Sequence, residues 1–127
     1  CDITVISGED ALTWPLMAVG AKGVISVTAN VVPDRVSKMV HAALDKDMDT
    51  AEQIHRQLFR LNKVMFIETN PIPVKTALGM MGFIQPEFRL PLCEMSAGNK
   101  EELAQVLKEL GILADKASQR KKVGSKK

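Results

Sequence analysis

Residues 22–35 read KGVISVTANVVPDR and join two different patterns. The first half is a short apolar run rich in β-branched residues, which predicts a strand over residues 23–28. The run ends abruptly before Asn30, and a helical pattern begins at Pro33, a residue that suits a first helical position. A buried strand with small and polar residues at its tip is typical of α/β folds, in which ligands lie at the carboxyl ends of parallel strands.

A similar β-branched run, ITVI at residues 3–6, comes first in the chain and ends in Ser-Gly. Between the two runs, residues 11–19 (ALTWPLMAV) predict a helix closed by Gly20. Pro15 removes one backbone hydrogen bond, so we expect a bend or an irregular first turn. The order strand, helix, strand predicts parallel pairing with a right-handed crossover. Neither strand alternates polar and apolar residues, and this lack of alternation is typical of strands that are covered on both faces.

Four helical patterns follow the second predicted strand, each defined by an apolar stripe or by capping signals. They are residues 33–44, residues 50–65 behind a capping box at Thr50–Gln53, residues 70–82 with Asn70 as cap and Pro71 first, and residues 99–110 with Asn99 as cap and Gly111 as stop. Residues 83–98 form a long connection with two prolines. We therefore expect a β-α-β unit, four helices and a tail.

The composition is that of a globular protein, with 127 residues, 46% hydrophobic content and a net charge of +2. No apolar run approaches the roughly 18 residues of a membrane span. The two cysteines show no metal-binding spacing, which predicts free thiols and a reducing, cytoplasmic location. The chain enters a predicted strand directly after Cys1, so we expect it to be a piece of a longer protein.

Basic residues concentrate in the tail, residues 115–127, where six Lys or Arg accompany one Asp. Such a run fits either a nucleic-acid contact or a solvated, disordered terminus. We favour the disordered terminus, because the run has no aromatic residue and no periodicity, and we predict no nucleic-acid partner.

No complete catalytic constellation is visible in the sequence, and no metal or cofactor motif occurs. His41 and His55 lie in helical patterns, and we interpret both as surface or interface residues. Glu9 and Asp10 are adjacent and fit the first turn of a helix. Lys63 and Lys75 are isolated lysines in helical patterns. A Schiff-base lysine needs a desolvated pocket, which helix surfaces do not supply. Trp14 fits either core or interface.

Three blocks in order resemble one family of enzymes. They are SGEDALTWPLMAVGAKGVISVTANVVP from residue 7, FIETNPIPVKTALGMMG from residue 66 and FRLPLCEMS from residue 88. These blocks are similar to the last two βα units and the C-terminal helices of the dihydrodipicolinate synthase (4-hydroxy-tetrahydrodipicolinate synthase) family, and the resemblance covers residues 3–113. Related lyases, such as N-acetylneuraminate lyase, tend to show GAIGSTYN where this chain has GVISVTAN, which favours the synthase.

The resemblance implies a fold and a division of the chain. The family fold is a TIM (β/α)8 barrel followed by a helical domain, and a barrel needs roughly 200 residues or more. Residues 1–46 would supply the last two βα units of the barrel, residues 47–114 the C-terminal helical domain, and residues 115–127 a disordered tail. The fold class is therefore α/β, as a part of a longer chain.

The resemblance also implies a reaction, in which pyruvate condenses with aspartate semialdehyde in lysine (diaminopimelate) biosynthesis. The Schiff-base lysine, the proton-relaying tyrosine and threonines and the arginine of the family match no residue of this chain, so we predict no catalytic residue here and no activity of the chain alone. Two substrate-binding positions carry over. Ile25 matches a residue whose main-chain carbonyl faces pyruvate, and Gly8 matches a glycine beside the substrate. The family needs no metal or cofactor and usually forms a homotetramer.

Two alternatives stay open at this point. The first is another pyruvate-dependent aldolase of the same superfamily, similar to N-acetylneuraminate lyase. The second is a non-enzymatic helical module that binds a partner through its apolar stripes, against which the predicted β-α-β start argues.

Overall fold

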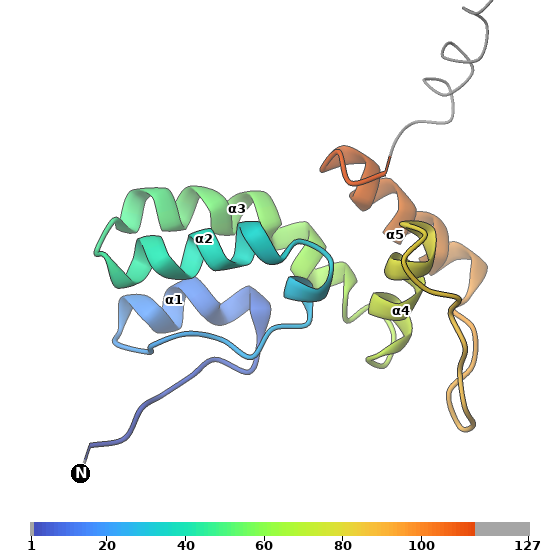
Figure 1. Ribbon diagram of the computed structural model, residues 1–127, viewed down its shortest axis with the longest axis horizontal. Coiled ribbons are helices and arrows are strands. Elements are labelled where there is room, and N and C mark those ends of the chain that lie inside the picture. Colours follow the sequence, from blue (N-terminus) through green and yellow to red (C-terminus); the bar gives the residue numbers. More distant parts are fainter. Residues whose placement is uncertain (1, 114–127) are drawn as a thin grey trace, which may run out of the picture.

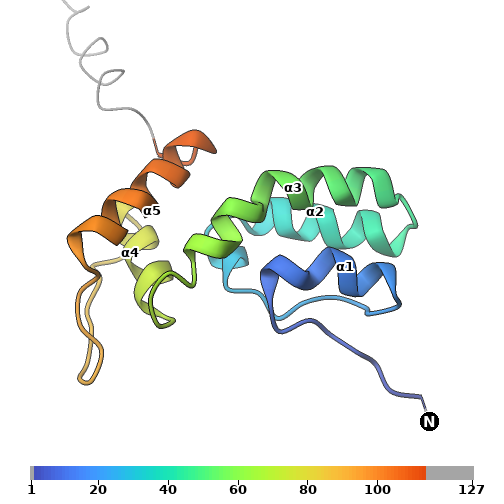
Figure 2. The ribbon, with the colours of Figure 1, turned by 180° about the vertical axis from the view of Figure 1, so that it is seen from behind.

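The computed structural model describes residues 2–113 and is built from helices and loops (Figure 1). The elements in chain order are the 3-10 turn η1 (Asp10–Leu12), α1 (Thr13–Ala18), the 3-10 turn η2 (Thr28–Asn30), α2 (Pro33–Leu44), α3 (Met48–Val64), α4 (Ile72–Met80) and α5 (Ala97–Glu109). Helices α1, α2 and α3 lie side by side, and α4 and α5 pack together near the C-terminal end of α3, as Figure 1 and Figure 2 both show.

The two predicted strands are wrong as secondary structure. Within residues 2–113 neither strand forms, and the two extended segments meet in a single parallel bridge. The bridge pairs Ser7 with Val24, with hydrogen bonds from Ser7 N to Gly23 O (2.8 Å), from Ile25 N to Ser7 O (2.9 Å) and from Lys22 N to Val5 O (2.8 Å). Two paired segments alone are marginal, because strands need further neighbours to form a stable ladder. The predicted parallel direction is nevertheless confirmed.

Several apolar side chains of these extended segments face solvent, whereas Val24 packs against the core, so the described residues alone do not cover both faces of the segments. Ile3 is 75% exposed and Ile25 is 78% exposed. A groove of about 450 Å³ runs between the second segment and α2, and Val36 and Val40 line it from the helix. Contiguous exposed apolar surface of this kind marks an interaction site.

Helix α1 begins irregularly, as predicted from Pro15. A 3-10 turn precedes it, and Thr13 Oγ1 donates a 3.2 Å hydrogen bond to the Glu9 carbonyl. The helix ends at Ala18, one residue earlier than predicted, and Gly20 follows with a φ of 114°. A positive φ of this size favours glycine, which explains why the helix stops here.

Helix α2 spans the predicted residues and starts at Pro33, so this prediction is confirmed. The predicted capping box of the next helix is wrong. Asp47 is the N-cap of α3, and its side chain accepts a 3.1 Å hydrogen bond from the Thr50 amide. The aspartate lies three residues before Thr50 and reaches its N–H first, so Thr50 becomes part of the first turn.

The predicted asparagine caps are also wrong. Helix α4 begins after Pro71 rather than after Asn70, and α5 begins at Ala97. Asn99 lies inside the first turn of α5, where its Nδ2 donates a 2.8 Å hydrogen bond to Glu68 Oε1. The same carboxylate oxygen accepts hydrogen bonds from the Ser96 amide (3.0 Å) and the Ser96 hydroxyl (2.8 Å). A carboxylate from the loop before α4 thus stabilises the start of α5.

The core lies between the helices and continues from α2 through α3 to α5. It consists mainly of fully buried aliphatic and methionine side chains, which include Val36, Met39, Leu58, Leu61, Met65, Leu103 and Leu107. The predicted long connection before α5 is confirmed, and its Leu90 is 91% exposed. In the described part of the chain, no helix combines the length and the apolar character that crossing a bilayer requires. The predicted tail lies outside the described residues.

Candidate functional site

The ends of the two extended segments come together around the carboxylate of Asp10. This side chain is only 3% exposed and lies in η1, directly after the first segment. Its Oδ1 accepts a 2.5 Å hydrogen bond from the Ser26 hydroxyl. Its Oδ2 accepts hydrogen bonds from the amides of Val27 (2.9 Å) and Thr28 (3.1 Å). One buried carboxylate therefore binds three donors of the turn that follows the second segment.

The turn after the first segment is held by its own serine. Ser7 is 1% exposed, its hydroxyl donates a 2.8 Å hydrogen bond to the Glu9 carbonyl, and the Glu9 amide donates back to Ser7 Oγ at 3.2 Å. Gly8 between them is exposed, and a Cβ added there would meet no atom within 4 Å. The backbone at Gly8 therefore presents a small, open surface at the edge of the site.

Ile25 lies beside this surface, because its amide donates a 2.9 Å hydrogen bond to the Ser7 carbonyl. Its side chain is 78% exposed. Among residues 2–113, no hydrogen-bond donor reaches the Ile25 carbonyl. The structure thus places the two predicted site residues, Gly8 and Ile25, at the same edge, and whether they bind a substrate stays a prediction.

Two further hydrogen bonds fix the same turn, one within the turn and one to the long helix α3. Ser26 Oγ, which donates to Asp10, also accepts a 2.8 Å hydrogen bond from the Ala29 amide. The hydroxyl of Thr28 donates a 2.9 Å hydrogen bond to Asn62 Oδ1, and both side chains are buried. The turn is therefore fixed from two sides, by Asp10 and by α3.

Sequence reasoning missed the role of Asp10, which it assigned to the start of a helix. The residue does lie in the first turn of η1, but its carboxylate binds the other segment 16 to 18 residues away in sequence. Only the pairing of the two segments brings these atoms together. The sequence does show polar residues within 26–30, after the second segment, and an acid after the first segment. To infer a contact between them, one would need to know the register in which the two segments pair.

Of the surface or interface interpretation of His41 and His55, the surface alternative is wrong for His55, which is buried, and confirmed for His41, which is exposed. His55 is 8% exposed and stacks on Trp14 with 5.6 Å between ring centroids. Its Nδ1 and the Nε1 of Trp14 are buried without a hydrogen-bond partner among the described residues. Burial lowers the pKa of His55, which keeps the imidazole neutral.

The remaining polar candidates do not gather into a catalytic centre. The Nζ of Lys75 donates a hydrogen bond to the Glu87 carbonyl and lies 5.1 Å from the centre of the Phe88 ring. Lys63 is exposed on α3. No group of three or more His, Cys, Asp or Glu side chains that could hold a metal occurs within residues 2–113. Cys93 has a free, exposed thiol, as predicted.

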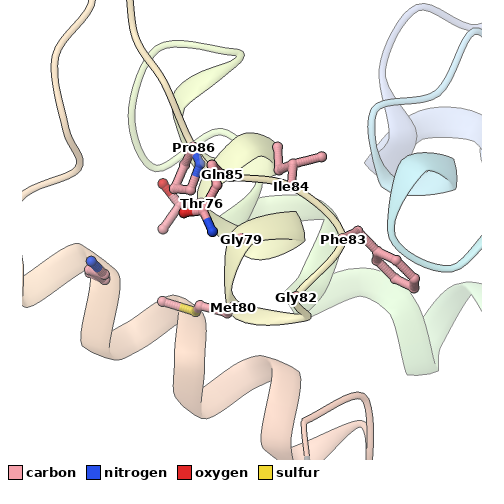
Figure 3. Close-up of a pocket in the computed structure, with 9 residues that line it drawn as sticks. Thr76, Gly79, Met80, Gly82, Phe83, Ile84, Gln85 and Pro86 are labelled. Carbon is pink, nitrogen blue, oxygen red and sulfur yellow. The ribbon is translucent and has the colours of Figure 1, made fainter.

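A separate open pocket of about 430 Å³ lies where α4 ends (Figure 3). The end of α4 and the segment 82–86 that follows it form most of its wall, and Lys100 of α5 completes it. Figure 3 shows this segment passing back along α4, with the Phe83 ring directed away from the other labelled residues. Neither Gly8 nor Ile25 lines this pocket.

With this geometry in place, comparison with known proteins gives the family. The model of the dihydrodipicolinate synthetase family matches residues 1–110. The chain belongs to this family. The dihydrodipicolinate synthetase fold is also found among solved structures: the enzyme from Aquifex aeolicus superposes with a TM-score of 0.85 at 55% identity, covering 87% of this chain and 38% of that one.

The names of two further relatives state an enzyme activity and, in one case, a bound molecule. The 4-hydroxy-tetrahydrodipicolinate synthase of Methanocaldococcus jannaschii is 60% identical over 111 residues, which are 87% of this chain and 38% of that enzyme. A dihydrodipicolinate synthase from Acinetobacter baumannii, described as chloride-inhibited and complexed with pyruvate, matches with a TM-score of 0.84 at 41% identity over 87% of this chain and 38% of that one. The chain thus spans little more than a third of the relatives it matches.

Proposed function

We propose that this chain is the C-terminal part of a 4-hydroxy-tetrahydrodipicolinate synthase, a lyase that condenses pyruvate with aspartate semialdehyde. The observation that carries the proposal is the 60% identity with the Methanocaldococcus jannaschii enzyme over 111 residues. At this level of identity, two chains share their fold. The pyruvate in the Acinetobacter baumannii relative supports pyruvate as one substrate.

In this proposal residues 1–46 supply the last two βα units of a (β/α)8 barrel, and residues 47–114 form a helical C-terminal domain. The parallel bridge between Ser7 and Val24 supports the barrel units, since barrel strands are parallel. The apolar groove beside α2 supports them too, because a closed barrel would cover it with another βα unit.

The site itself would be a wall of the pyruvate pocket at the carboxyl ends of two adjacent strands. Ile25 would present its free carbonyl to pyruvate, and Gly8 would leave room for the substrate beside it. No side chain at this edge is a nucleophilic amine, so the Schiff-base lysine would come from the longer protein. The complete enzyme would work in the cytoplasm as a homotetramer, without a metal or cofactor.

The experiment compares the full-length protein with this chain alone. The full-length protein should consume pyruvate only when aspartate semialdehyde is present. Borohydride should trap a pyruvyl adduct on one lysine, and mass spectrometry should place that lysine outside this sequence. The chain alone should give no adduct. A stable adduct on one lysine of residues 1–127, or full-length protein that consumes no pyruvate, would contradict the proposal.

A further inference from the structure

The peptide group between Ile25 and Ser26 is fixed on both of its sides. On one side the Ile25 amide donates to the Ser7 carbonyl at 2.9 Å. On the other side the Ser26 hydroxyl donates to Asp10 Oδ1 at 2.5 Å. The carbonyl of Ile25 belongs to this peptide group, and no donor within residues 2–113 binds it. Its direction is therefore set by the two neighbouring contacts and not by a hydrogen bond of its own.

Asp10 supplies the second of these contacts and continues it into the turn. Its Oδ2 accepts from the Val27 and Thr28 amides at 2.9 and 3.1 Å. Hydrogen bonds to an ionised carboxylate are stronger than those between neutral groups. Without the carboxylate, two buried or half-buried amides would lose their acceptor, and the turn would rotate to find others. Such a rotation would turn the Ile25 carbonyl as well.

No neighbouring acid can take over this role. Glu9 is adjacent in sequence, but its main-chain carbonyl and amide bind Thr13 and Ser7, and its side chain accepts no hydrogen bond from residues 26–28. Among the described residues, Asp10 is the acid whose carboxylate joins the two extended segments.

We propose that Asp10 is a positioning residue of the site, whose buried carboxylate aims the Ile25 main-chain carbonyl at the substrate through Ser26. This inference rests on the proposed function, because it takes the Ile25 carbonyl as a wall of the pyruvate pocket. Asp10 itself does not touch the substrate. It acts through the Ser26 hydroxyl and the amides of the turn.

The test uses the full-length protein with Asp10→Asn and Ser26→Ala. Asparagine keeps the size of the side chain and removes its charge. Alanine at Ser26 removes the contact beside the Ile25 peptide and the acceptor of the Ala29 amide, and it leaves the Val27 and Thr28 amides bound to Asp10. Asp34→Asn is the matched control, because Asp34 is exposed in the first turn of α2 and its carboxylate accepts no hydrogen bond from residues 26–28. Each variant is assayed well below its melting temperature.

The informative measurement is the rate at which borohydride-trappable pyruvyl adduct forms per folded site. A misaimed carbonyl lowers this rate and kcat/KM for pyruvate on the order of tenfold to a hundredfold, while the final number of trapped sites stays that of the wild type. KM for the second substrate should change less. A purely structural role would instead reduce the number of sites and leave the rate per site unchanged. Asp34→Asn should match the wild type in every readout.

The outcomes separate the two proposals. If the wild type forms the adduct, and Ser26→Ala and any folded Asp10→Asn keep its rate within about twofold, then the positioning role is wrong and the proposed function stands. If Asp10→Asn does not fold, Ser26→Ala alone decides. If the wild type forms no adduct, the proposed function is wrong, and the positioning role is overturned with it.

Discussion

The hydroxyl of Thr28 donates a 2.9 Å hydrogen bond to Oδ1 of Asn62, and the two residues are 0% and 2% exposed. This contact joins the turn at the candidate site to the last turn of α3. A buried donor or acceptor that loses its partner has a high cost, whereas replacing both partners by apolar groups can be nearly neutral.

Substituting only one partner should therefore destabilise the full-length protein, because the other partner is then buried without a hydrogen bond. Thr28→Val and Asn62→Leu should each lower the free energy of unfolding by about 1–3 kcal/mol. The double variant should lose less than the sum of the two. Denaturant unfolding of all four proteins gives the interaction energy. Strictly additive losses would show that the two side chains are not coupled.

His55 should make stability depend on pH in the range where histidine titrates. Burial lowers its pKa below 6.5, opposed by Glu52 and assisted by Arg56. The unfolded chain therefore binds a proton at a higher pH than the folded one. The stabilising contribution is complete above about pH 6.5 and is lost as the pH falls through the lower folded pKa.

The measurement is a set of melting curves between pH 5 and 8 for the wild type, His55→Phe and His41→Gln. Phenylalanine keeps an aromatic ring against Trp14 and cannot titrate, so this part of the pH dependence should disappear. His41→Gln, at an exposed histidine of α2, is the control for the loss of a histidine as such. Parallel curves for the wild type and His55→Phe would show that His55 does not titrate on unfolding.

Most of the helices could be predicted from the sequence, because apolar spacing and Pro33 act locally. The helix starts were less predictable. Asp47 and Thr50 are both good capping residues for α3, and the side chain that reaches a free amide sets the start of the helix. Asn99 is a good capping residue for α5, but its side chain binds Glu68 instead. The strands failed for a different reason, since a strand exists only with its neighbours, and the described residues offer a single parallel bridge.

The candidate site could be located but not described from the sequence. Gly8 and Ile25 follow from the resemblance and lie side by side in the structure. The role of Asp10 depends on the register of two segments separated by a helix, which no local pattern reports. His55 was misassigned because a polar residue in a helical pattern is usually exposed, and only the tertiary packing against Trp14 buries it.

Glu68 should contribute a second, more acidic pH dependence. Hydrogen bonds from Asn99 and Ser96 hold the pKa of its carboxyl below the usual value of 4.5. Because the folded pKa is depressed, the stabilisation is present above about pH 4.5 and is lost as the pH falls through the folded pKa. Glu68→Gln should flatten melting curves in this acidic range. Glu101→Gln, an exposed residue of α5, should not.

Gly79 and Gly98 should respond oppositely to alanine. A Cβ at Gly79 would lie 2.9 Å from Cγ of Pro86, which Figure 3 shows beside Thr76 of α4, so the segment after α4 must move. A Cβ at Gly98 would meet nothing within 4 Å. Gly98→Ala should stabilise by about 0.4–1 kcal/mol. Gly79→Ala should destabilise by about 1–3 kcal/mol. Equal melting temperatures for the two variants would contradict this packing.

Gly8 gives the sharpest test of the candidate site, because its substitution separates activity from stability. The backbone at Gly8 does not have the positive φ that favours glycine, and an added Cβ meets no atom of the chain. Gly8→Val should therefore leave the melting temperature of the full-length protein nearly unchanged. If the substrate lies against this residue, the branched side chain should lower kcat/KM for pyruvate by on the order of a hundredfold. Leu12→Val, at an exposed position of the following turn, is the control and should keep normal kinetics. Normal kinetics for Gly8→Val would remove the tip of the first segment from the substrate pocket, even though the chain belongs to the family.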